Sequence, residues 1–380
     1  MFKIIEFLDN FTPKKKMICF HSFPDFSDNA YAIFEYISND PKMKNYHLVW
    51  LMSLRNRAFE EEINKKFGSR VKVYNKKSLK GIMSYVRCKY IFFTHGIYGN
   101  INSKHKNKRI NLWHGMPFKS VGLLDGKDKS ELSRQNIFVV TSDLCQDIYS
   151  RAFDQPKEKI WILGQPRTDL LFKKSNVLEK LSVNENNFNK KIIWMPTYRK
   201  SILGDIRIDG DFKEDRIGGL SSSELLQLDI FLEQQKTLLV VKLHPMDAIK
   251  KFNQNYKMIF FLTNQDLDIM QEQLYPLIGE MDAMLTDYSS VYIDFLLLNR
   301  PIGFMVDDLD SYSDGRGFLF ENFMDYLPGM KIRTLDGMKD FILSVNENNE
   351  NYEEKRIKVR DLFHLFKDNN SSERIIEKLI

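Results

Sequence analysis

Several side chains that can move a proton or hold a phosphate stand directly after short apolar runs of this 380-residue chain. The first is His114, within residues 111–119, NLWHGMPFK. A histidine that ends a strand and precedes a glycine is expected on a tight turn with accessible backbone amides. Near neutral pH its imidazole can take the proton of an attacking hydroxyl group, and Lys119 could hold a phosphate as a point charge. The alternative is a histidine that only hydrogen-bonds a loop.

Three further basic side chains occupy comparable positions. His244 is followed by Pro245, which stops the preceding strand and keeps His244 extended, so we expect its ring to point outward from the sheet end. Arg199 follows another apolar strand, where a guanidinium group suits bidentate contact with a phosphate. Arg316 lies between two glycines on a loop from which it could reach a phosphate. Taken alone, Arg199 and Arg316 could each be a surface side chain without a role, whereas a second strand-end histidine, one per domain, is harder to explain in that way for His244.

The segment from Thr286 to Asp294, TDYSSVYID, predicts an anion site. A strand is expected to end at Thr286, and the residues from Asp287 to Ser290 are expected to form the N-cap of a helix. Hydroxyl groups and free amides at a helix N-terminus bind anions and match a pyrophosphate. Asp294, four residues after Ser290 on the same helical face, could orient a ribose or the serine hydroxyls. A simple helix cap is the alternative interpretation.

Short apolar strands, with helical patterns in several of the gaps, must position these side chains. The alternation predicts parallel sheets with helices on both faces. In such sheets ligands bind outside the carboxyl ends of the strands, which is where nearly all of the clusters above fall. The predicted strands are 17–20, 47–51, 71–74, 90–94, 110–113, 137–140, 160–163, 192–195, 238–243, 258–261, 283–286 and 302–306.

The composition and the polar segments predict two domains. Hydrophobic residues make up 43% of the chain, which is enough for two ordinary cores. The polar segment 172–191, rich in asparagine and lysine, is the expected boundary, because linkers concentrate polar residues. We therefore predict an α/β protein with one domain at 1–175, a second at 190–349, and one or two C-terminal helices at 350–380.

Composition also bears on the compartment. No run of about 18 apolar residues is present, so no membrane span is expected. The N-terminus lacks the apolar region and the cleavage site of a secretory signal. Cys19, Cys88 and Cys145 are far apart and odd in number, which indicates neither a disulfide framework nor a zinc site. These features predict a cytoplasmic protein.

The net charge of +5 conceals an uneven distribution. Residues 1–120 hold 22 Lys and Arg against 9 Asp and Glu, whereas the remaining residues hold 34 against 42. A basic first third is typical of a protein that binds a polyanion or an anionic membrane surface. An ordinary solvated surface on a lysine-rich protein is the alternative.

In their order along the chain, these clusters resemble the CDP-glycerol:poly(glycerophosphate) glycerophosphotransferase family, the teichoic acid primases and polymerases. The segment 26–29, which ends at Asn29, is also similar to a family element near the first strand. The resemblance spans residues 20–330, and six short motifs occur in the family's order. They are His114–Lys119, Pro196–Arg199, Leu243–Pro245, Thr286–Asp294, Arg316-Gly317 and Pro328-Gly329.

The resemblance implies a GT-B-like fold, with two doubly wound Rossmann-like domains facing a central cleft. The N-terminal domain would face the acceptor and the membrane, and the C-terminal domain would bind the CDP donor. His114 would be the catalytic base, with Asn29, Gly115 and Lys119 on the acceptor side. The donor phosphates and the nucleotide would be held by His244, which is also a catalytic candidate, and by Arg199, Thr286, Asp287, Ser289, Ser290, Asp294 and Arg316.

The implied reaction is a transfer of glycerol phosphate or ribitol phosphate from its CDP donor, with release of CMP. The acceptor would be a hydroxyl of a teichoic-acid or capsule-type polymer, or of its lipid-linked primer, at the inner face of the cell membrane. Met330 after the Pro-Gly pair and Met305-Val306 depart from the family pattern, so the choice between glycerol and ribitol stays open.

The sequence calls for no cofactor. It has no carboxylate cluster or Asp-x-Asp motif that would demand a metal, although a divalent metal is not excluded. We expect no nucleic-acid partner, and the oligomeric state is left open.

Two other functions are compatible with the same residues. A glycosyltransferase with the same fold and a nucleotide-sugar donor would also place histidines and arginines around a diphosphate. A non-catalytic protein that binds polyanions would explain the charge distribution, but it would not need two strand-end histidines.

Overall fold

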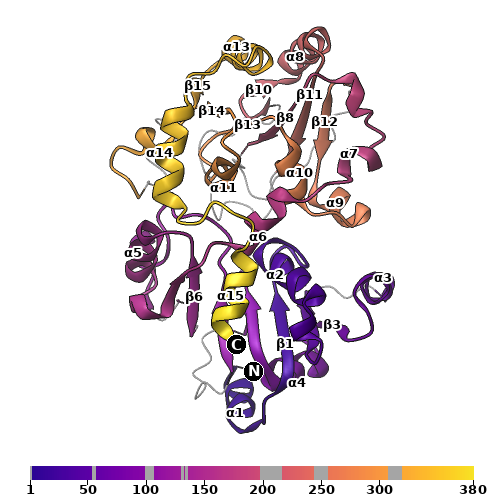
Figure 1. The fold of residues 1–380 in the computed structure, drawn as a ribbon, viewed down its shortest axis with the longest axis vertical. Helices are drawn as coiled ribbons and strands as arrows, with labels where there is room; N and C mark the ends of the chain where they lie inside the picture. The colour runs from indigo at the N-terminus through magenta and orange to yellow at the C-terminus, as the bar shows by residue number, and fades with distance from the viewer. Residues whose placement is uncertain are drawn as a thin grey trace. The chain divides into compact units, whose positions relative to one another are not determined.

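The computed structural model describes residues 2–53, 57–98, 107–129, 132, 136–196, 216–243, 256–306 and 319–380. It divides into two compact units, each built on its own parallel sheet (Figure 1). The N-terminal unit comprises Met1–Gly115, Val121–Leu170 and Phe363–Ile380, and the C-terminal unit comprises Met116–Ser120 and Leu171–Leu362. The chain therefore changes unit several times.

The sheet of the N-terminal unit has the strand order β3-β2-β1-β4-β5-β6-β7, and all of its neighbouring strands run parallel. This is the strand order of a doubly wound nucleotide-binding fold. From β1 the strands are added first toward one edge of the sheet and then, from β4 onward, toward the other, so the topological switch point lies between β1 and β4. The strands are β1 (Lys15–His21), β2 (His47–Met52), β3 (Val71–Asn75), β4 (Cys88–Phe93), β5 (Lys108–Asn111), β6 (Ile137–Val140) and β7 (Ile160–Ile162).

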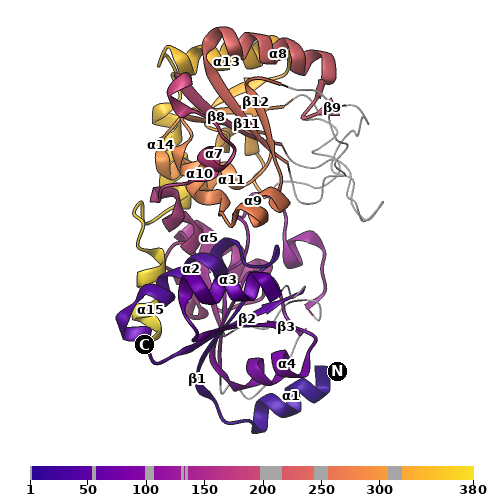
Figure 2. The same ribbon diagram turned by 90° about the vertical axis from the view of Figure 1, so that its right-hand side faces the viewer.

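Helices cover both faces of this sheet because neighbouring residues of β1 point to opposite sides. Phe20 packs against Phe34 of α2 and against Trp50 of β2. The next residue back, Cys19, belongs to a second apolar cluster that includes Ile5 of α1 and Tyr85 of α4. Figure 2 shows α2 on one side of the strands and α1 with α4 on the other. Burial on both faces explains why these strands are continuous apolar runs.

Local sequence signals begin several of the helices in this unit. Ser78 accepts a hydrogen bond from the amide of Gly81 and caps α4, and Ser142 caps α5 in the same way through Cys145. The helices are α1 (Phe2–Phe11), α2 (Asp28–Asn39), α3 (Arg57–Phe67), α4 (Leu79–Arg87), α5 (Asp143–Ala152), α6 (Pro166–Asp169) and α15 (Ser371–Leu379).

The C-terminal helix α15 returns to the N-terminal unit. It packs against α2 and α6, and the amides of Ser371 and Ser372 donate to the buried carboxylate of Asp169 at 2.9 and 2.8 Å. An acidic side chain thus satisfies the first amides of α15, a favourable contact at a helix N-terminus. Sequence alone predicted 350–380 as one C-terminal segment, but α14 and α15 belong to different units.

The sheet of the C-terminal unit repeats the same topology with the order β12-β11-β8-β13-β14-β15, again with all neighbouring strands parallel. Its topological switch point, where the order of added strands reverses, lies between β8 and β13. The strands are β8 (Lys190–Met195), β11 (Thr237–Lys242), β12 (Ile259–Leu262), β13 (Ala283–Thr286), β14 (Ile302–Met305) and β15 (Met330–Ile332), with a small antiparallel pair β9 (Arg216–Ile217) and β10 (Leu220–Ser221).

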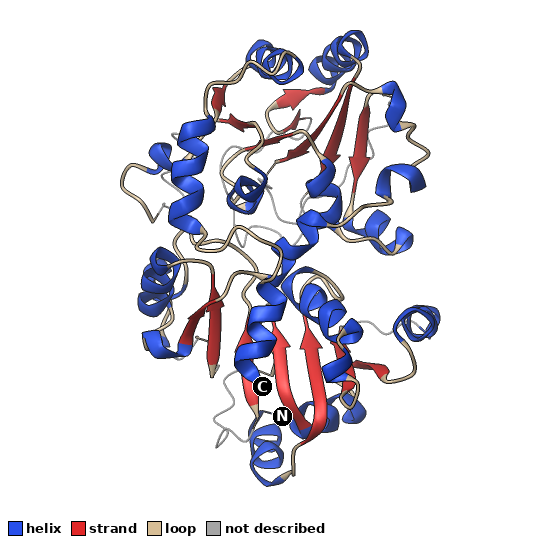
Figure 3. Cartoon of the chain, in the orientation of Figure 1, coloured by secondary structure: helices blue, strands red, loops and turns tan. Residues whose placement is uncertain are grey.

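The helices of this unit flank its sheet (Figure 3). Ser221 forms a capping box with Glu224 at the start of α8, and Thr263 forms one with Asp266 at α9. The helices are α7 (Val177–Lys180), α8 (Ser222–Gln235), α9 (Asn264–Met270), α10 (Leu274–Glu280), α11 (Val291–Phe295), α13 (Leu335–Asn346) and α14 (Glu353–Phe363).

Every strand predicted from the sequence is present, with ends that differ by two residues at most. The predicted α/β class with two doubly wound sheets is confirmed. The pattern missed β15 and the β9–β10 pair, which are too short to show a period. The chain passes between the units at Leu170, ahead of the polar segment 172–191, which contains α7 and contributes to the C-terminal unit. In the part of the chain described here, no helix is long and apolar enough to cross a bilayer.

Candidate functional site

His114 follows β5 on a turn that is made by its neighbours. The side-chain oxygen of Asn111 accepts from the amide of Trp113 at 2.8 Å, and Trp113 has a φ of 56°. The tight turn expected here from His114 and Gly115 has its left-handed residue at Trp113, whereas Gly115 has no positive φ. A left-handed conformation costs a residue with a Cβ about 1–2 kcal/mol. Packing of the Trp113 ring at 4.8 Å from Phe153 helps to offset that cost.

The hydrogen bond of the His114 ring identifies which nitrogen is basic. Its Nδ1 lies 3.2 Å from the carbonyl oxygen of Thr94. A carbonyl only accepts, so Nδ1 carries the proton and Nε2 keeps its lone pair. The side chain is exposed, yet the protein packed around the ring lowers the pKa of His114, although Asp28 acts in the opposite direction. His114 is therefore neutral at physiological pH, as a proton acceptor must be.

Two further histidines lie at neighbouring strand ends. His95 follows β4, and its ring stacks on that of His114 with centroids 4.0 Å apart and an interplanar angle of 16°. His21 ends β1, and its Nδ1 lies 2.8 Å from the carbonyl oxygen of Leu51. Burial lowers the pKa of His95 to about 3 and that of His21 to about 4. The strand-end rule that selected His114 applies to both residues, but the sequence analysis did not use it for them.

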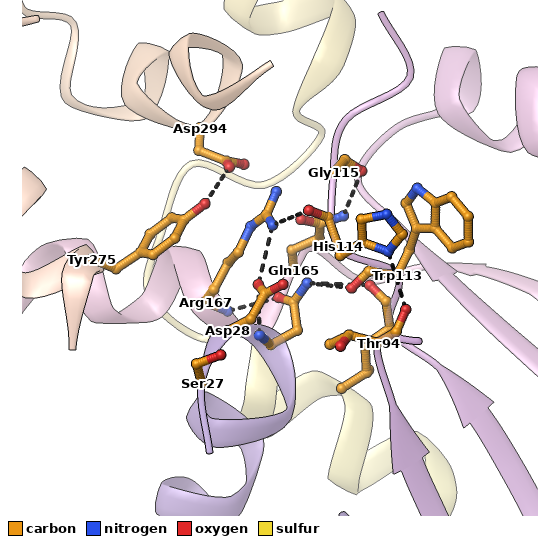
Figure 4. Close-up of polar contacts among 12 residues, drawn as sticks. Ser27, Asp28, Thr94, Trp113, His114, Gly115, Gln165, Arg167, Tyr275 and Asp294 are labelled. Carbon is orange, nitrogen blue, oxygen red and sulfur yellow. Dashed lines mark hydrogen bonds and ion pairs between the residues drawn. The ribbon is translucent and has the colours of Figure 1, made fainter. Parts of the chain in front are cut away.

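A buried polar network holds the backbone on both sides of His114 (Figure 4). Arg167 of α6 donates through Nη1 to the carbonyl oxygen of His114 at 2.8 Å and to Asp28 Oδ1 at 3.1 Å. The side chain of Asn29 donates to the carbonyl oxygens of Leu112 and Trp113 at 3.2 and 3.0 Å. Its own oxygen accepts from the amide of Arg167 at 2.9 Å.

These contacts change the interpretation of Asn29, which was predicted on the acceptor side. Asn29 is fully buried, and its amide joins three segments that are distant in sequence. Any effect of Asn29 on an acceptor would therefore act through the turn that carries His114. Arg167 was not predicted, since no motif surrounds it and its partner residues are about 50 and 140 positions away in the chain.

After His114 the chain leaves the N-terminal unit within two residues. The carbonyl oxygen of Gly115 accepts from the hydroxyl of Tyr149 at 2.9 Å, which holds it in the N-terminal unit. Residues 116–120 then belong to the C-terminal unit, where Phe118 is fully buried against Tyr292 and Phe320. Lys119, predicted on the acceptor side next to His114, thus belongs to the C-terminal unit.

The predicted anion segment follows β13, at the topological switch point of the second sheet. Thr286 is buried, and its hydroxyl donates to the carbonyl oxygen of Met195 at the end of β8 at 2.8 Å. The buried carboxylate of Asp287 accepts from the amide of Ser289 at 3.2 Å. Thr286 and Asp287 therefore shape the turn, while the partly exposed side chains of Ser289 and Ser290 are better placed to meet a ligand.

The helix after this turn is shorter than expected. Ser290 occupies the N-cap position of α11, as predicted, but its side chain makes no capping hydrogen bond. Helix α11 has five residues before a 3₁₀ turn at Leu296–Leu298. Asp294 is buried and accepts from the hydroxyl of Tyr275 of α10 at 2.7 Å (Figure 4). Tyr275 was not predicted, and nothing in its local sequence marks it.

Three predicted residues, Arg199, His244 and Arg316, lie outside the described residues. The strands that precede them, β8, β11 and β14, end at the same edge of the sheet as β13, because all four run parallel. Among the described residues, no group of three or more His, Cys, Asp or Glu side chains gathers as metal ligands would.

Comparisons with known proteins agree with the motifs. The family model of CDP-glycerol:poly(glycerophosphate) glycerophosphotransferase matches residues 4–380. A teichoic acid poly(glycerol phosphate) polymerase of Bacillus spizizenii is 27% identical and is matched over 100% of this chain and 95% of its own length. A teichoic acid poly(ribitol-phosphate) polymerase of the same organism is also 27% identical, over 84% of this chain and 52% of its own length.

A solved structure of the wall teichoic acid polymerase TagF superimposes on the whole chain. The TM-score is 0.75 at 21% sequence identity, and the match covers 100% of this chain and 92% of the other. At that identity the likeness speaks for the fold alone, and it confirms the predicted GT-B-like class.

Proposed function

Because the chain belongs to the CDP-glycerol:poly(glycerophosphate) glycerophosphotransferase family, we propose that it transfers a polyol phosphate from a CDP donor to a hydroxyl group of a teichoic-acid or capsule-type polymer. The observation that carries the proposal is the state of His114. Its ring is neutral, Nδ1–H is bound to a backbone carbonyl, and Nε2 keeps its lone pair on an exposed side chain.

In the proposed reaction, an acceptor hydroxyl attacks the β-phosphorus of the donor. The new oxygen–phosphorus bond forms as the bond from that phosphorus to the bridging oxygen breaks, and CMP leaves. The hydroxyl proton passes to Nε2 of His114. Asp28 then stabilises the imidazolium by charge, because it raises the pKa of this histidine.

The C-terminal unit would hold the donor. We assign the pyrophosphate to Ser289 and Ser290, with Arg199, His244 and Arg316 as the basic partners. Hydroxyl groups and cations at this position would stabilise the charge that grows on the leaving phosphate, which is the main catalytic contribution in phosphoryl transfer. Thr286 and Asp287 would act indirectly, by shaping the turn that carries the serines.

We further propose that the protein works on a lipid-linked acceptor at the inner membrane face. The support comes from α1, whose side chains Ile4, Phe7 and Phe11 are 65%, 62% and 71% exposed on one helical face. Helix α4 lies beside α1 (Figure 2). Leu79, at the start of α4, is 74% exposed. Exposed lysines lie near these residues in the sequence, with Lys3 on α1, Lys15 and Lys16 at the start of β1, and Lys77 and Lys80 on either side of Leu79, while Lys72 on β3 is also exposed. Exposed apolar side chains together with exposed lysines suit an anionic bilayer surface.

A donor screen tests the transferase proposal. Purified protein would be incubated with a lipid-linked acceptor and with CDP-glycerol, CDP-ribitol or nucleotide sugars, and the released nucleotide would be identified. We expect CMP from one CDP-polyol, and a rate about 10²- to 10⁴-fold lower for His114→Ala. Turnover of a nucleotide sugar alone would refute the proposal in favour of a glycosyltransferase. Tight binding of CDP without turnover of any donor would refute catalysis.

A further inference from the structure

The ring of His95 forms a flat surface against which the ring of His114 rests. The two imidazoles are nearly parallel, with centroids 4.0 Å apart. Both rings form a hydrogen bond with Thr94. His114 Nδ1 contacts the carbonyl oxygen of Thr94, and His95 Nδ1 lies 3.0 Å from the hydroxyl oxygen of Thr94. We propose that His95 is a positioning residue that holds the His114 ring in the orientation required for proton transfer.

His114 needs such support because its side chain is exposed. Among the described residues, the 3.2 Å contact with Thr94 is the only hydrogen bond of its ring, and one such bond leaves the ring free to tilt. His95 is better fixed. It is partly buried, it contacts the Thr94 hydroxyl, and the ring of Phe23 packs edge-on against it at 5.7 Å and 75°. A rigid ring beneath a less constrained one limits the tilt of the latter.

The geometry excludes direct proton exchange between the two rings. The N–H groups and lone pairs of an imidazole lie in the plane of the ring, and the planes here differ by only 16°. Neither ring can therefore direct a hydrogen bond at the other. His95 acts through packing rather than as a second acid or base.

The charges around the pair keep His95 neutral while His114 works. Burial, together with repulsion between like charges when His114 carries a proton, lowers the pKa of His95 to about 3. A proton taken up by His114 therefore does not pass to His95. The charged groups that act on His114 are Asp28, Arg167 and Lys127, and those that act on His95 are His114, His21 and Lys76.

A kinetic test compares His95→Ala with His95→Phe and rests on the proposed transferase function. Loss of the ring should lower kcat about 10- to 100-fold, because a small displacement of a catalytic group has effects of that size. The KM for the donor should hardly change, and His95→Phe, which keeps a flat ring, should retain most of kcat. His47→Ala is the matched control, since His47 is exposed at the amino end of β2, the opposite edge of the sheet.

Two kinetic outcomes would overturn the proposal. A normal kcat for His95→Ala would show that the ring is not needed. Equal loss in His95→Phe and His95→Ala would show that a ring nitrogen is required, which contradicts support by packing. Circular dichroism would confirm that each variant is folded.

A second measurement does not depend on catalysis and so separates this proposal from the proposed function. NMR of protein labelled in its histidine rings reports the tautomer and the pKa of His114, assigned with His114→Asn. In His95→Ala we expect water to reach the freed face, so the pKa should rise toward that of free histidine and the Nδ1–H tautomer should lose its dominance. An unchanged tautomer and pKa would refute the role of His95, even if the wild type released no CMP from any donor.

Discussion

Replacement of Asn29 by alanine is the sharpest test of how the His114 turn is held. The change removes three hydrogen bonds at a fully buried site and leaves the carbonyl oxygens of Leu112 and Trp113 and the amide of Arg167 without their partner. Buried polar groups that lose a partner cost about 1–3 kcal/mol each, and local relaxation recovers part of it. We therefore expect the free energy of unfolding to fall by about 2–5 kcal/mol.

Catalysis should suffer beyond the loss of stability. The two carbonyl groups held by Asn29 directly precede His114, so their release should displace the imidazole. A displacement of about 1 Å lowers a rate by about 100-fold, and we expect kcat of Asn29→Ala to fall by that amount at a temperature where the variant is folded. Asn29→Asp keeps an acceptor for the Arg167 amide but has no donor for the carbonyl groups, and it should be as damaging.

Urea unfolding followed by tryptophan fluorescence would give the stability change, and CMP release would give kcat. Asn39→Ala is the matched control, since Asn39 lies on the same helix and also donates to a carbonyl group, that of Glu35, but is exposed. Its free energy of unfolding should change by no more than about 0.5 kcal/mol. If Asn29→Ala matched the wild type in both measurements, the proposed positioning of the turn would be wrong.

Three further predictions concern pH, lipid and metal. Burial lowers the pKa of His21 to about 4, so below pH 6.5 the unfolded chain binds more protons than the folded protein does. The free energy of unfolding should therefore drop by about 3 kcal/mol from pH 6.5 to pH 4. In urea titrations, His21→Asn should lessen that drop. Phe7→Glu should weaken flotation with anionic vesicles, whereas Ile230→Glu, at an equally exposed site on α8, should not; equal losses would argue against α1 as the lipid surface. CMP release should persist in excess chelator, and a complete loss that magnesium restores would refute catalysis without metal.

Local patterns were sufficient to predict the strands and the strand-end clusters. A buried parallel strand must be apolar along its whole length, so each strand stands out as a short run, and polar residues that follow it lie at the ligand-binding edge. His114 and the segment from Thr286 to Ser290 were found by this rule. The rule fails for very short strands, so it missed β15 and the β9–β10 pair, which are only two or three residues long.

The residues that orient His114 could not be found in this way. Arg167 and Asn29 are separated by 138 positions, and each is buried only because α2 and α6 pack together. The left-handed conformation of Trp113 likewise depends on the hydrogen bond that its amide donates to the side-chain oxygen of Asn111 and on the packing of its ring against α5 and Phe153. A local propensity would have assigned that conformation to Gly115.

By itself, the sequence therefore determined the fold class and the family, and it supplied His114 as the proposed base. Apolar periodicity, turn residues and the order of motifs are properties of short segments, so they can be recognised without the tertiary structure. Only the tertiary structure decided the tautomer of His114, the stacking of His95 beneath it, and the network of Asn29 and Arg167. It also decided that residues 116–120 and α15 belong to a different unit from the elements next to them in the sequence. The physical reason is that hydrogen bonds and buried contacts form between whichever groups the packed sheets bring together, whatever their separation along the chain.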